Sequence, residues 1–463
     1  MAADMFKTVL IANRGEIALR VARTCRELGI RTVAVHSTAD RESAVVRFAD
    51  ESVHIGPPSA KASYLHMPSI MEAALRTGAD AIHPGYGFLS EDPDFAEVCQ
   101  THGVTFIGPP PHVIEKLGDK ALARRLMAEA GLPVLPGSTG AVNGLAEARK
   151  VAERIGYPLI LKAVAGGGGR GIAVVRAADQ LTQAYRETCA HARAVFGDER
   201  LYIERFVEDA RHIEVQVLCD RHGGAVHLGE RDCSVQRRYQ KLIEEAPAPN
   251  LPDELRQQMC AAAVRGALAV GYVGAATFEF VVSSDGSFHL MEVNCRLQVE
   301  HPVTEMSTGI DLVREQLLIA AGRPLSVRQE DLAPRGWSIE SRVNAEDPER
   351  NFAPTPGLLT EFMPPGGPFV RVDSHAYPGW LMGPDYDSLL AKTVVWAPDR
   401  EQAIARMDRA LGEFRVEGQG LRTTIGFLRE ILAHPAHRAG THTTGFVAEM
   451  RTETAAVRGG PGS

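Results

Sequence analysis

The sequence predicts a mixed fold in which an α/β region is followed by an α+β region, and three observations support this fold class. Across roughly the first hundred residues, short β-branched runs alternate with amphipathic stretches, a rhythm typical of a parallel sheet covered by helices. Near residue 166, a glycine-rich turn joins two apolar strands. At residues 277–300, two apolar runs flank Asp285-Gly286, which is a strong signal for an antiparallel hairpin.

Composition sets the broad class of the protein. The chain has 463 residues, 44% of them hydrophobic, so we expect roughly two to four domains with ordinary cores. A net charge of −8, without a long basic run, argues against nucleic acid or an anionic membrane as the main partner. The seven cysteines include no Cys-x-x-Cys pair, which predicts reduced thiols, no zinc site and a cytoplasmic location. The N-terminus has only a short apolar segment, Thr8 to Ala12, so we expect neither a signal peptide nor a membrane span.

Residues 1–107 are predicted to form an N-terminal unit with a parallel half-sheet of the nucleotide-binding kind. Its first turn, Asn13 to Glu16, lacks the three glycines of the dinucleotide fingerprint, so we do not expect a dinucleotide. A Pro-rich segment and a helix containing Lys116 to Ala130 then form a connector over residues 108–133.

The second unit, residues 134–206, is organised around the glycine loop from Gly166 to Gly171. The loop formally satisfies G-x-G-x-x-G, but a strand follows it where a dinucleotide site needs a helix, and the sequence contains no P-loop. A glycine turn between strands favours a flap whose backbone N–H groups close over phosphates, and the alternative is a loose surface hairpin. Lys162 lies in the apolar strand before the loop, where an ammonium is costly unless it meets an anion such as phosphate. Lys120 would serve the same purpose, although alone it is more often a solvated helix lysine.

Residues 207–450 form the third and largest unit, which begins with antiparallel strands. His212, Glu214 and Gln216 share one face of an early strand, and a surface face explains them about as well as a ribose or phosphate site. The run from Arg231 to Lys241 is rich in cations, and because such runs usually lie in solvent, it does not by itself give Lys241 a role. The tail, residues 451–463, is small and polar, which predicts disorder.

The hairpin at 277–300 predicts a cation site. If it turns at Asp285-Gly286, Glu279 lies directly across from Glu292, and carboxylates with Cβ atoms roughly 4.5–5.5 Å apart repel unless a shared cation neutralises them. A polar row continues along one face of the second strand: Glu292, Asn294, Arg296, Gln298 and Glu300. A solvated strand face is the alternative. We favour magnesium, because it prefers oxygen ligands and usually keeps phosphate oxygens in its shell, and the motif therefore indicates a nucleotide.

Longer segments resemble one family, in its order and with its spacing, across nearly the whole chain. They are IANRGEIALRVARTCRELGI, HPGYGFLSE, GGGGRGI, RDCSVQRRYQK, EEAPAP, TFEF, NCRLQVEHPVTE and SRVNAEDP. On these motifs the chain resembles biotin carboxylase, of the ATP-grasp superfamily. The resemblance implies an ATP-grasp fold with an N-terminal Rossmann-like domain, a mobile lid over residues 134–206 and a C-terminal antiparallel-sheet domain, with ATP held between the lid and the C-terminal unit.

The resemblance assigns ATP, and magnesium or manganese, to particular residues. Glu204 to Val207 would be the hinge whose backbone contacts adenine. The positions implied for ATP are Lys120, Lys162, Gly166, Gly167, Gly168, Gly169, Glu204, Val207 and His212. The positions implied for the metal are Glu279, Glu292 and Asn294.

The resemblance also implies an acid–base site. Lys241, Arg296 and the backbone of Val299 would bind bicarbonate, which gives Lys241 the support that its charge run lacked. Glu300 would deprotonate bicarbonate, making it a nucleophile toward the γ-phosphate so that carboxyphosphate forms. Arg342 would stabilise the enolate of biotin.

Two positions depart from the family pattern. Tyr239 stands where bacterial members have histidine near the nucleotide, and Ile172 stands where methionine is frequent near adenine. Neither change removes a charge that the chemistry needs, and their effect on nucleotide affinity stays open.

The partners follow from the same resemblance. No Ala-Met-Lys-Met or similar biotin-attachment segment occurs in the sequence, so we expect biotin to arrive as a substrate on a carrier protein or domain. The other partners implied are a carboxyltransferase, as in an acyl-CoA carboxylase such as acetyl-CoA carboxylase, and a second copy of the chain in a homodimer. Two other functions stay open: another carboxylate–amine ligase of the superfamily, or a catalytically silent nucleotide-binding subunit. The final carboxyl acceptor also stays open.

Overall fold

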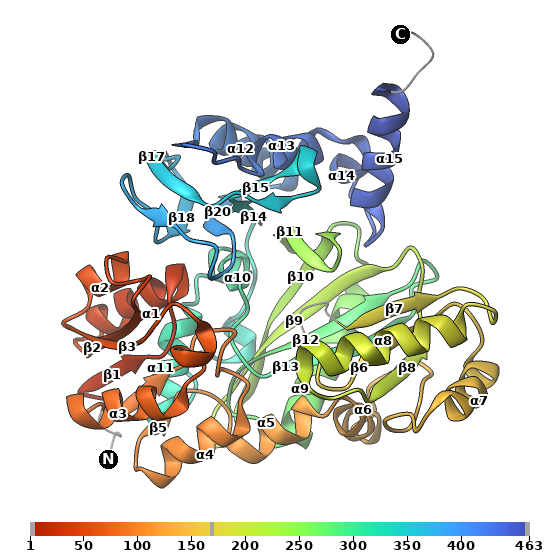
Figure 1. Cartoon of the computed structure of the whole chain (residues 1–463), viewed down its shortest axis with the longest axis horizontal. Helices are drawn as coiled ribbons and strands as arrows, with labels where there is room; N and C mark the ends of the chain where they lie inside the picture. The colour runs from red at the N-terminus through yellow and green to blue at the C-terminus, as the bar shows by residue number, and fades with distance from the viewer. Residues whose placement is uncertain (1–4, 167–170, 459–463) are drawn as a thin grey trace.

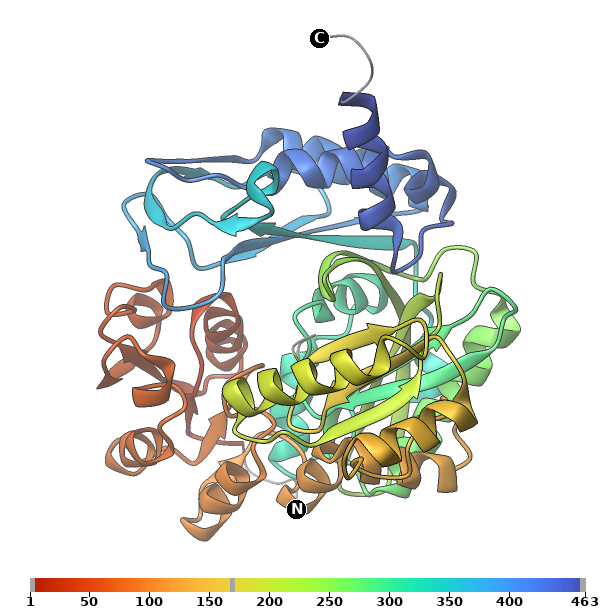
Figure 2. The same cartoon turned by 45° about the vertical axis from the view of Figure 1, so that its right-hand side comes forward.

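The computed structural model describes residues 5–166 and 171–458. Figure 1 shows the N-terminal unit (red) and a small sheet with its two helices (gold to yellow) on opposite sides of the green strands of a large sheet, and the cyan to blue elements above include the remaining strands of that sheet. Figure 2, turned by 45°, shows the small sheet and its helices in front of the large sheet. The predicted combination of an α/β region and an α+β region is confirmed.

The N-terminal unit contains a five-stranded sheet in the order β3-β2-β1-β4-β5, and every pairing in it is parallel, as predicted. After the first strand, the Asn13 amide donates to the carbonyls of Pro84 and Tyr86, at 2.6 and 2.8 Å, and so joins the loops at the ends of two strands. The strands are β1 (Thr8–Ile11), β2 (Arg31–Ser37), β3 (Glu51–Gly56), β4 (Ala81–His83) and β5 (Thr105–Phe106). The helices are α1 (Gly15–Glu27), α2 (Ala44–Phe48), α3 (Met67–Thr77) and α4 (Pro93–Thr101).

The connector contains two helices rather than one. They are α5 (Pro111–Gly118) and α6 (Lys120–Glu129). The break lies at Asp119, whose extended backbone ends α5 and whose side chain caps α6 by accepting from the N–H groups of Ala121 and Leu122. Because an aspartate N-cap satisfies donors that a new helix leaves free, a second helix begins directly at Lys120.

The small sheet has the order β7-β6-β8 and is antiparallel throughout. Lys162 pairs with Ile172 across β6 and β7, so the glycine segment joins two neighbouring strands, as predicted. Gly167, Gly168 and Gly169 lie outside the described residues. The strands are β6 (Leu159–Ala163), β7 (Ile172–Val175) and β8 (Leu201–Arg205), and the helices are α7 (Leu145–Ile155) and α8 (Leu181–Phe196).

The large sheet has eight strands in the order β13-β12-β9-β10-β11-β14-β20-β18, all antiparallel to their neighbours. The strands are β9 (Arg211–Cys219), β10 (Ala225–Arg237), β11 (Gln240–Ala246), β12 (Gly274–Val282), β13 (Phe288–Asn294), β14 (Trp337–Asn344), β18 (Val370–Ser374) and β20 (Leu389–Ala397). Its helices are α9 (Asp253–Ala269), α10 (His301–Thr308) and α11 (Leu312–Ala320). This order brings β11 and β14, which are far apart in the chain, into direct contact.

The hairpin of β12 and β13 has the predicted register at its important pair, because Glu279 lies directly across from Glu292. One residue further the register shifts, and Phe280 pairs with Leu290. The expectation that the second strand continues to Glu300 is wrong, since β13 ends at Asn294. The chain leaves the sheet at the next residue, Cys295, whose backbone N–H donates to Glu91 of the N-terminal unit at 2.9 Å.

The C-terminal elements include a second small sheet in the order β19-β17-β21. They are β15 (Glu346–Asp347), β16 (Ala353–Pro354), β17 (Gly357–Met363), β19 (Leu381–Met382), β21 (Arg415–Gly418), α12 (Arg400–Glu413), α13 (Ile425–Ala433), α14 (Pro435–Ala439) and α15 (Phe446–Arg458). The disorder expected for 451–463 is wrong for residues 451–458, which continue α15. Phe446, Val447 and Met450 anchor that helix in the core beside β10 and β14. Among the described residues, no helix is both long enough and apolar enough to cross a membrane.

Candidate active site

Lys241 on β11 lies at the centre of a buried cluster of carboxylates. Its Nζ donates to Glu214 at 2.7 Å, to Glu279 at 3.1 Å and to Glu300 at 2.5 Å. Burial alone would lower the pKa of Lys241, but these carboxylates outweigh burial and raise that pKa well above its usual value. The cation that these contacts give Glu279 is therefore a side-chain ammonium, whereas the prediction was a metal ion shared with Glu292.

Glu300 is buried between two cations. Its Oε2 accepts from Arg342 Nη2 at 2.9 Å, while Oε1 faces Lys241. Burial alone would raise the pKa of Glu300, but the charges of Lys241, Arg342 and Arg231 outweigh burial and hold that pKa well below its usual range. Glu300 is therefore ionised at neutral pH, which is the state that a general base requires.

Glu244 completes the contacts of Arg342. It lies on β11, and its Oε1 accepts from Arg342 Nε at 2.6 Å. Burial raises the pKa of Glu244 to about 7 in spite of the arginine. Arg342 thus links an ionised carboxylate, Glu300, to one that titrates near neutrality.

Glu279 gathers the polar side chains of the hairpin. It accepts from Asn294 at 3.0 Å and from Gln298 at 2.8 Å, and His212 Nε2 lies 2.9 Å from its Oε2. The predicted polar row therefore converges, although through a turn rather than along one strand. The open question for the face of β9 is answered in part, because His212, Glu214 and Gln216 are buried in this cluster rather than solvated.

Arg296 connects the row to the N-terminal unit. Its guanidinium donates to Glu91 at 2.8 Å, to Gln298 at 2.8 Å and to Asn294 at 3.1 Å. These partners hold the guanidinium beside the carboxylate cluster, where it adds a further fixed cation to Lys241, Arg342 and Arg231. The backbone of Val299, the other predicted bicarbonate contact, lies in the turn between Gln298 and Glu300, and its carbonyl accepts from Lys392 at 2.9 Å.

The predicted nucleotide residues lie on several elements: Lys162 and Glu204 on the small sheet, Lys120 at the start of α6, and His212 on β9 of the large sheet. Lys162 on β6 is ion-paired with Glu204 on the neighbouring strand β8. Burial alone would lower the pKa of Lys162, but Glu204 and then Glu292 raise it, so its charge is coupled to the hairpin on the large sheet. Lys120 donates to the carbonyl of Gly166 at 2.5 Å and so reaches the start of the glycine loop. Val207 lies two residues after the end of β8, in the link to β9 of the large sheet.

The donors at the hairpin fit a magnesium ion. Glu279 and Glu292 are Cα partners across the two strands, and Asn294 lies beside them, with its Nδ2 donating to Glu279 and its Oδ1 accepting from Arg296. All three offer oxygen, the ligand type that Mg²⁺ prefers. Glu292 is only partly buried, and its charge acts on Lys162 of the small sheet.

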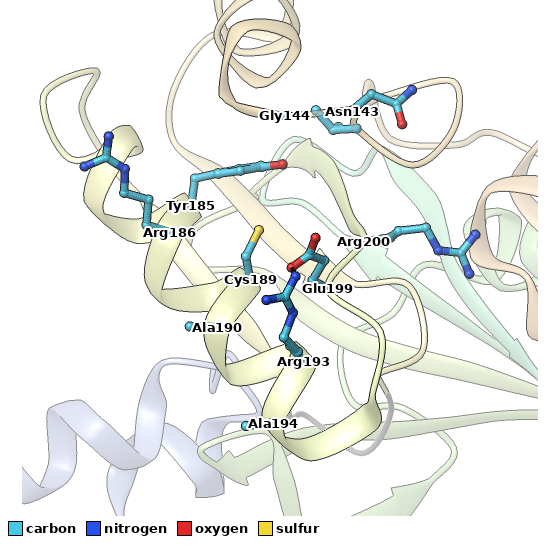
Figure 3. Close-up of a pocket in the computed structure, with 11 residues that line it drawn as sticks. Asn143, Gly144, Tyr185, Arg186, Cys189, Ala190, Arg193, Ala194, Glu199 and Arg200 are labelled. Carbon is cyan, nitrogen blue, oxygen red and sulfur yellow. Dashed lines mark ion pairs between the residues drawn. The ribbon is translucent and has the colours of Figure 1, made fainter.

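A separate cavity of about 670 Å³ lies between α8 and the segments before α7 and β8 (Figure 3). Tyr185, Cys189 and Arg193 of α8 line one wall, and Asn143 and Arg200 lie opposite. Of the predicted site residues that the structure describes, none lines this cavity. The chemistry described above therefore lies elsewhere, in the cluster around Lys241.

Several members of the cluster were not singled out from the sequence. Arg231 was placed in a charge run expected in solvent, yet it is fully buried and donates to Glu214 at 2.6 Å. Glu91 and Glu244 carried no local signal. Lys392 did carry one, because it interrupts the apolar run Leu389–Ala397 just as Lys162 interrupts its own strand.

Comparison with known proteins agrees with this architecture. Three family descriptions match successive parts of the chain: biotin carboxylase, N-terminal domain, over residues 5–114; carbamoyl-phosphate synthase L chain, ATP binding domain, over 119–328; and biotin carboxylase C-terminal domain over 340–449. Biotin carboxylase 1 of Bacillus subtilis (strain 168) is 52% identical over 444 residues, which cover 96% of this chain and 98% of that protein.

Solved structures resemble it over nearly the whole chain. A biotin carboxylase from Campylobacter jejuni, described as a β-γ-ATP complex, superposes with a TM-score of 0.93 at 45% identity, covering 96% of this chain and 99% of the other. The biotin carboxylase domain of 2-oxoglutarate carboxylase from Hydrogenobacter thermophilus, a dimer in complex with MgADP, ADP and bicarbonate, superposes with a TM-score of 0.94 at 46% identity, covering 97% and 98%.

The fold and the site together define an ATP-grasp enzyme, which has a small three-stranded antiparallel sheet and a large eight-stranded one. Within that class, the matching domains, the identity and the coverage lead to one family. The chain belongs to the biotin carboxylase family of ATP-dependent ligases.

Proposed function

We propose that this chain uses ATP and bicarbonate to carboxylate biotin held on a carrier protein or domain, the first half-reaction of an acyl-CoA carboxylase or a related carboxylase. The observation that supports this most is the Glu300 carboxylate, buried and ionised between Lys241 and Arg342. A fixed base beside two fixed cations suits an anionic substrate that must lose a proton. Two similar structures support the same substrates here. One is described as a β-γ-ATP complex, and the other contains MgADP, ADP and bicarbonate.

The first step makes an activated carboxylate. Lys241, Arg296 and the backbone of Val299 bind bicarbonate, and Glu300 takes its proton. The resulting oxygen attacks the γ-phosphorus of ATP, the bond to the β-phosphate oxygen breaks, and carboxyphosphate and ADP form.

The nucleotide side of the site stabilises the charge of that transfer. Lys120 and Lys162 supply cations from the side of the small sheet, and the glycine loop adds backbone donors. Glu279, Glu292 and Asn294 would hold magnesium, which would neutralise phosphate charge. His212 and the link from Glu204 to Val207 contact the rest of the nucleotide.

The second step moves the carboxyl group to biotin. Carboxyphosphate releases CO₂ and phosphate, and the phosphate takes the ureido proton of biotin. The enolate that results attacks CO₂, and its oxygen is stabilised by Arg342. Arg342 is held for this purpose by Glu244 and Glu300 on either side.

The domain organisation and partners belong to the same proposal. Residues 134–206 act as the lid, with residues 1–107, 108–133 and 207–450 as the N-terminal domain, connector and C-terminal region. The partners are a biotin carboxyl carrier, a carboxyltransferase and a second copy of this chain. A cytoplasmic location is supported by seven cysteines that are all free thiols in the structure.

The test is ADP release by the purified chain with MgATP, measured with and without bicarbonate and free biotin. We expect ADP release to require bicarbonate and to increase with biotin. ADP release that is indifferent to biotin contradicts the proposal, and a panel of other carboxylates and amines then identifies a different ATP-grasp ligase. MgATP binding without any cleavage would indicate a silent subunit instead.

A further inference from the structure

Lys392 on β20 is a fully buried lysine that the proposed reaction does not use. Its Nζ donates to the carbonyl of Val299 at 2.9 Å and lies 3.0 Å from Glu16 Oε1 and 3.9 Å from Asp373 Oδ2. A buried ammonium is unfavourable unless it is paired and hydrogen-bonded, so these contacts define its position. One of them is made to the backbone of the predicted bicarbonate turn.

The position of Lys392 in the sheet relates it directly to Arg342. The two residues are Cα partners across β14 and β20, so their side chains leave neighbouring strands on the same face. Arg342 binds the carboxylate of Glu300, and Lys392 binds the carbonyl of the preceding residue, Val299. Cations on adjacent strands therefore bind consecutive residues of one turn.

Lys241 gives that turn its third contact. It lies on β11, the strand next to β14 on the other side, and it binds the second oxygen of Glu300. The turn itself lies outside the sheet, because β13 ends at Asn294 and α10 begins at His301. Its geometry is therefore set by the cations of β11, β14 and β20 rather than by strand pairing.

The counter-ion of Lys392 comes from the N-terminal unit. Glu16 lies in the first turn of α1, is buried, and accepts from the hydroxyl of Tyr86 at 2.5 Å. Tyr86 follows β4 in the same unit, close to the carbonyls that Asn13 binds. A chain of contacts thus runs from the loops of the N-terminal sheet through Glu16 and Lys392 to Val299.

We propose that Lys392 is a positioning residue that holds the Val299–Glu300 turn in the geometry needed to bind and deprotonate bicarbonate, and that Glu16 makes this geometry depend on the N-terminal unit. The inference rests on the proposed function, since it concerns the same bicarbonate site. A displacement of roughly 1 Å at such a site reduces turnover on the order of 10²-fold, so a positioning role has a measurable consequence.

The experiment compares Lys392→Met with wild type in steady-state kinetics for bicarbonate and for MgATP. Methionine keeps the length of the side chain and removes its charge and its donors. We expect kcat/KM for bicarbonate to fall on the order of 10- to 100-fold, while KM for MgATP changes less than about twofold. The matched control is Arg400→Met, because Arg400 is a largely buried cation paired with Glu245, which points to the opposite face of β11 from Glu244.

A role in folding alone predicts a different pattern. In that case Lys392→Met and Arg400→Met lose stability and activity in parallel, without a selective change for bicarbonate, and the inference is overturned. If Lys392→Met does not fold, Glu16→Gln distinguishes the two roles. This variant keeps Lys392 and weakens the contact between Lys392 and the N-terminal unit. We expect Glu16→Gln to raise KM for bicarbonate selectively by roughly 3- to 10-fold, and an unchanged value overturns the inference.

The failure of this inference is distinguishable from the failure of the proposed function. If wild-type protein shows no bicarbonate-dependent ADP release, the proposed function is wrong and the inference falls with it. If wild type is active and both variants keep its kinetic constants for bicarbonate, the function stands and only the role of Lys392 is wrong.

Discussion

Lys241 and Glu300 lie 2.5 Å apart, from Nζ to Oε1, although 59 residues separate them in the chain. Both side chains are buried, so the contact is screened little by solvent. The same ammonium also binds Glu214 and Glu279, and the same carboxylate also binds Arg342. The pair therefore joins the hairpin proposed for magnesium to the base proposed for bicarbonate.

Glu300→Gln should remove bicarbonate-dependent turnover and leave nucleotide binding nearly intact. The amide keeps the shape of the side chain but cannot accept the proton of bicarbonate. We expect kcat to fall on the order of 10²- to 10⁴-fold, as is typical for loss of a general base. Steady-state ADP release and calorimetric titration with MgADP measure the two effects. Glu349→Gln, at an exposed position, is the control, and lost MgADP binding in the Glu300 variant would count against the assigned role.

Lys241→Met should be strongly destabilising, because it leaves Glu214, Glu279 and Glu300 buried without their shared cation. Breaking a buried ion pair by removing one partner lowers the free energy of unfolding by about 3–5 kcal/mol. Urea denaturation monitored by circular dichroism measures this, with the exposed Lys61→Met as the control. A loss as small as that of the control would mean that solvent, rather than Lys241, balances the carboxylates.

Glu244→Gln should change how stability depends on pH. The folded pKa of Glu244 is raised to about 7 by burial, above its unfolded value, so the folded state holds that proton more tightly. The stability contributed by this proton is fully present below the unfolded pKa and is lost as pH rises to about 7. Relative to the variant, wild type should therefore lose stability between about pH 5 and 7 and then level off. The measurement is the melting temperature of both proteins at a series of pH values across this range. A difference between the two melting temperatures that stays constant with pH would contradict the assignment.

Glu292→Gln should weaken magnesium-dependent nucleotide binding without disturbing the buried cluster. Glu292 is only partly exposed to solvent and pairs with Glu279 through the backbone, whereas Glu279 itself binds Lys241. We expect the magnesium concentration for half-maximal activity to rise on the order of 10-fold, with KM for bicarbonate nearly unchanged. A selective rise in KM for bicarbonate would place Glu292 in the other half of the site.

Local chemistry made much of this structure predictable, and long-range pairing explains the rest. The pairing of Glu279 with Glu292 follows from the turn at Asp285-Gly286, and the parallel N-terminal sheet follows from the alternation of strands and helices. The cluster around Lys241 depends instead on the order of β12, β9, β10 and β11 in the sheet, which no local pattern encodes.

Two differences between the predictions and the structure also result from contacts between residues far apart in the chain. The second hairpin strand ends at Asn294 because Glu91, 204 residues earlier in the chain, takes the backbone N–H of Cys295. Arg231 is buried rather than solvated because Glu214 and Thr304 accept from it. Lys392 was predictable in principle, since a lysine within an apolar strand was already the reason to single out Lys162.

The most direct test of the central claim follows labelled carbon from bicarbonate to biotin. Purified protein is incubated with MgATP, free biotin and isotopically labelled bicarbonate, and the label on biotin is measured together with ADP. The account predicts labelled carboxybiotin that requires ATP and is absent with Glu300→Gln. ADP formation without label on biotin, or label on biotin in the Glu300 variant at the wild-type rate, would contradict it.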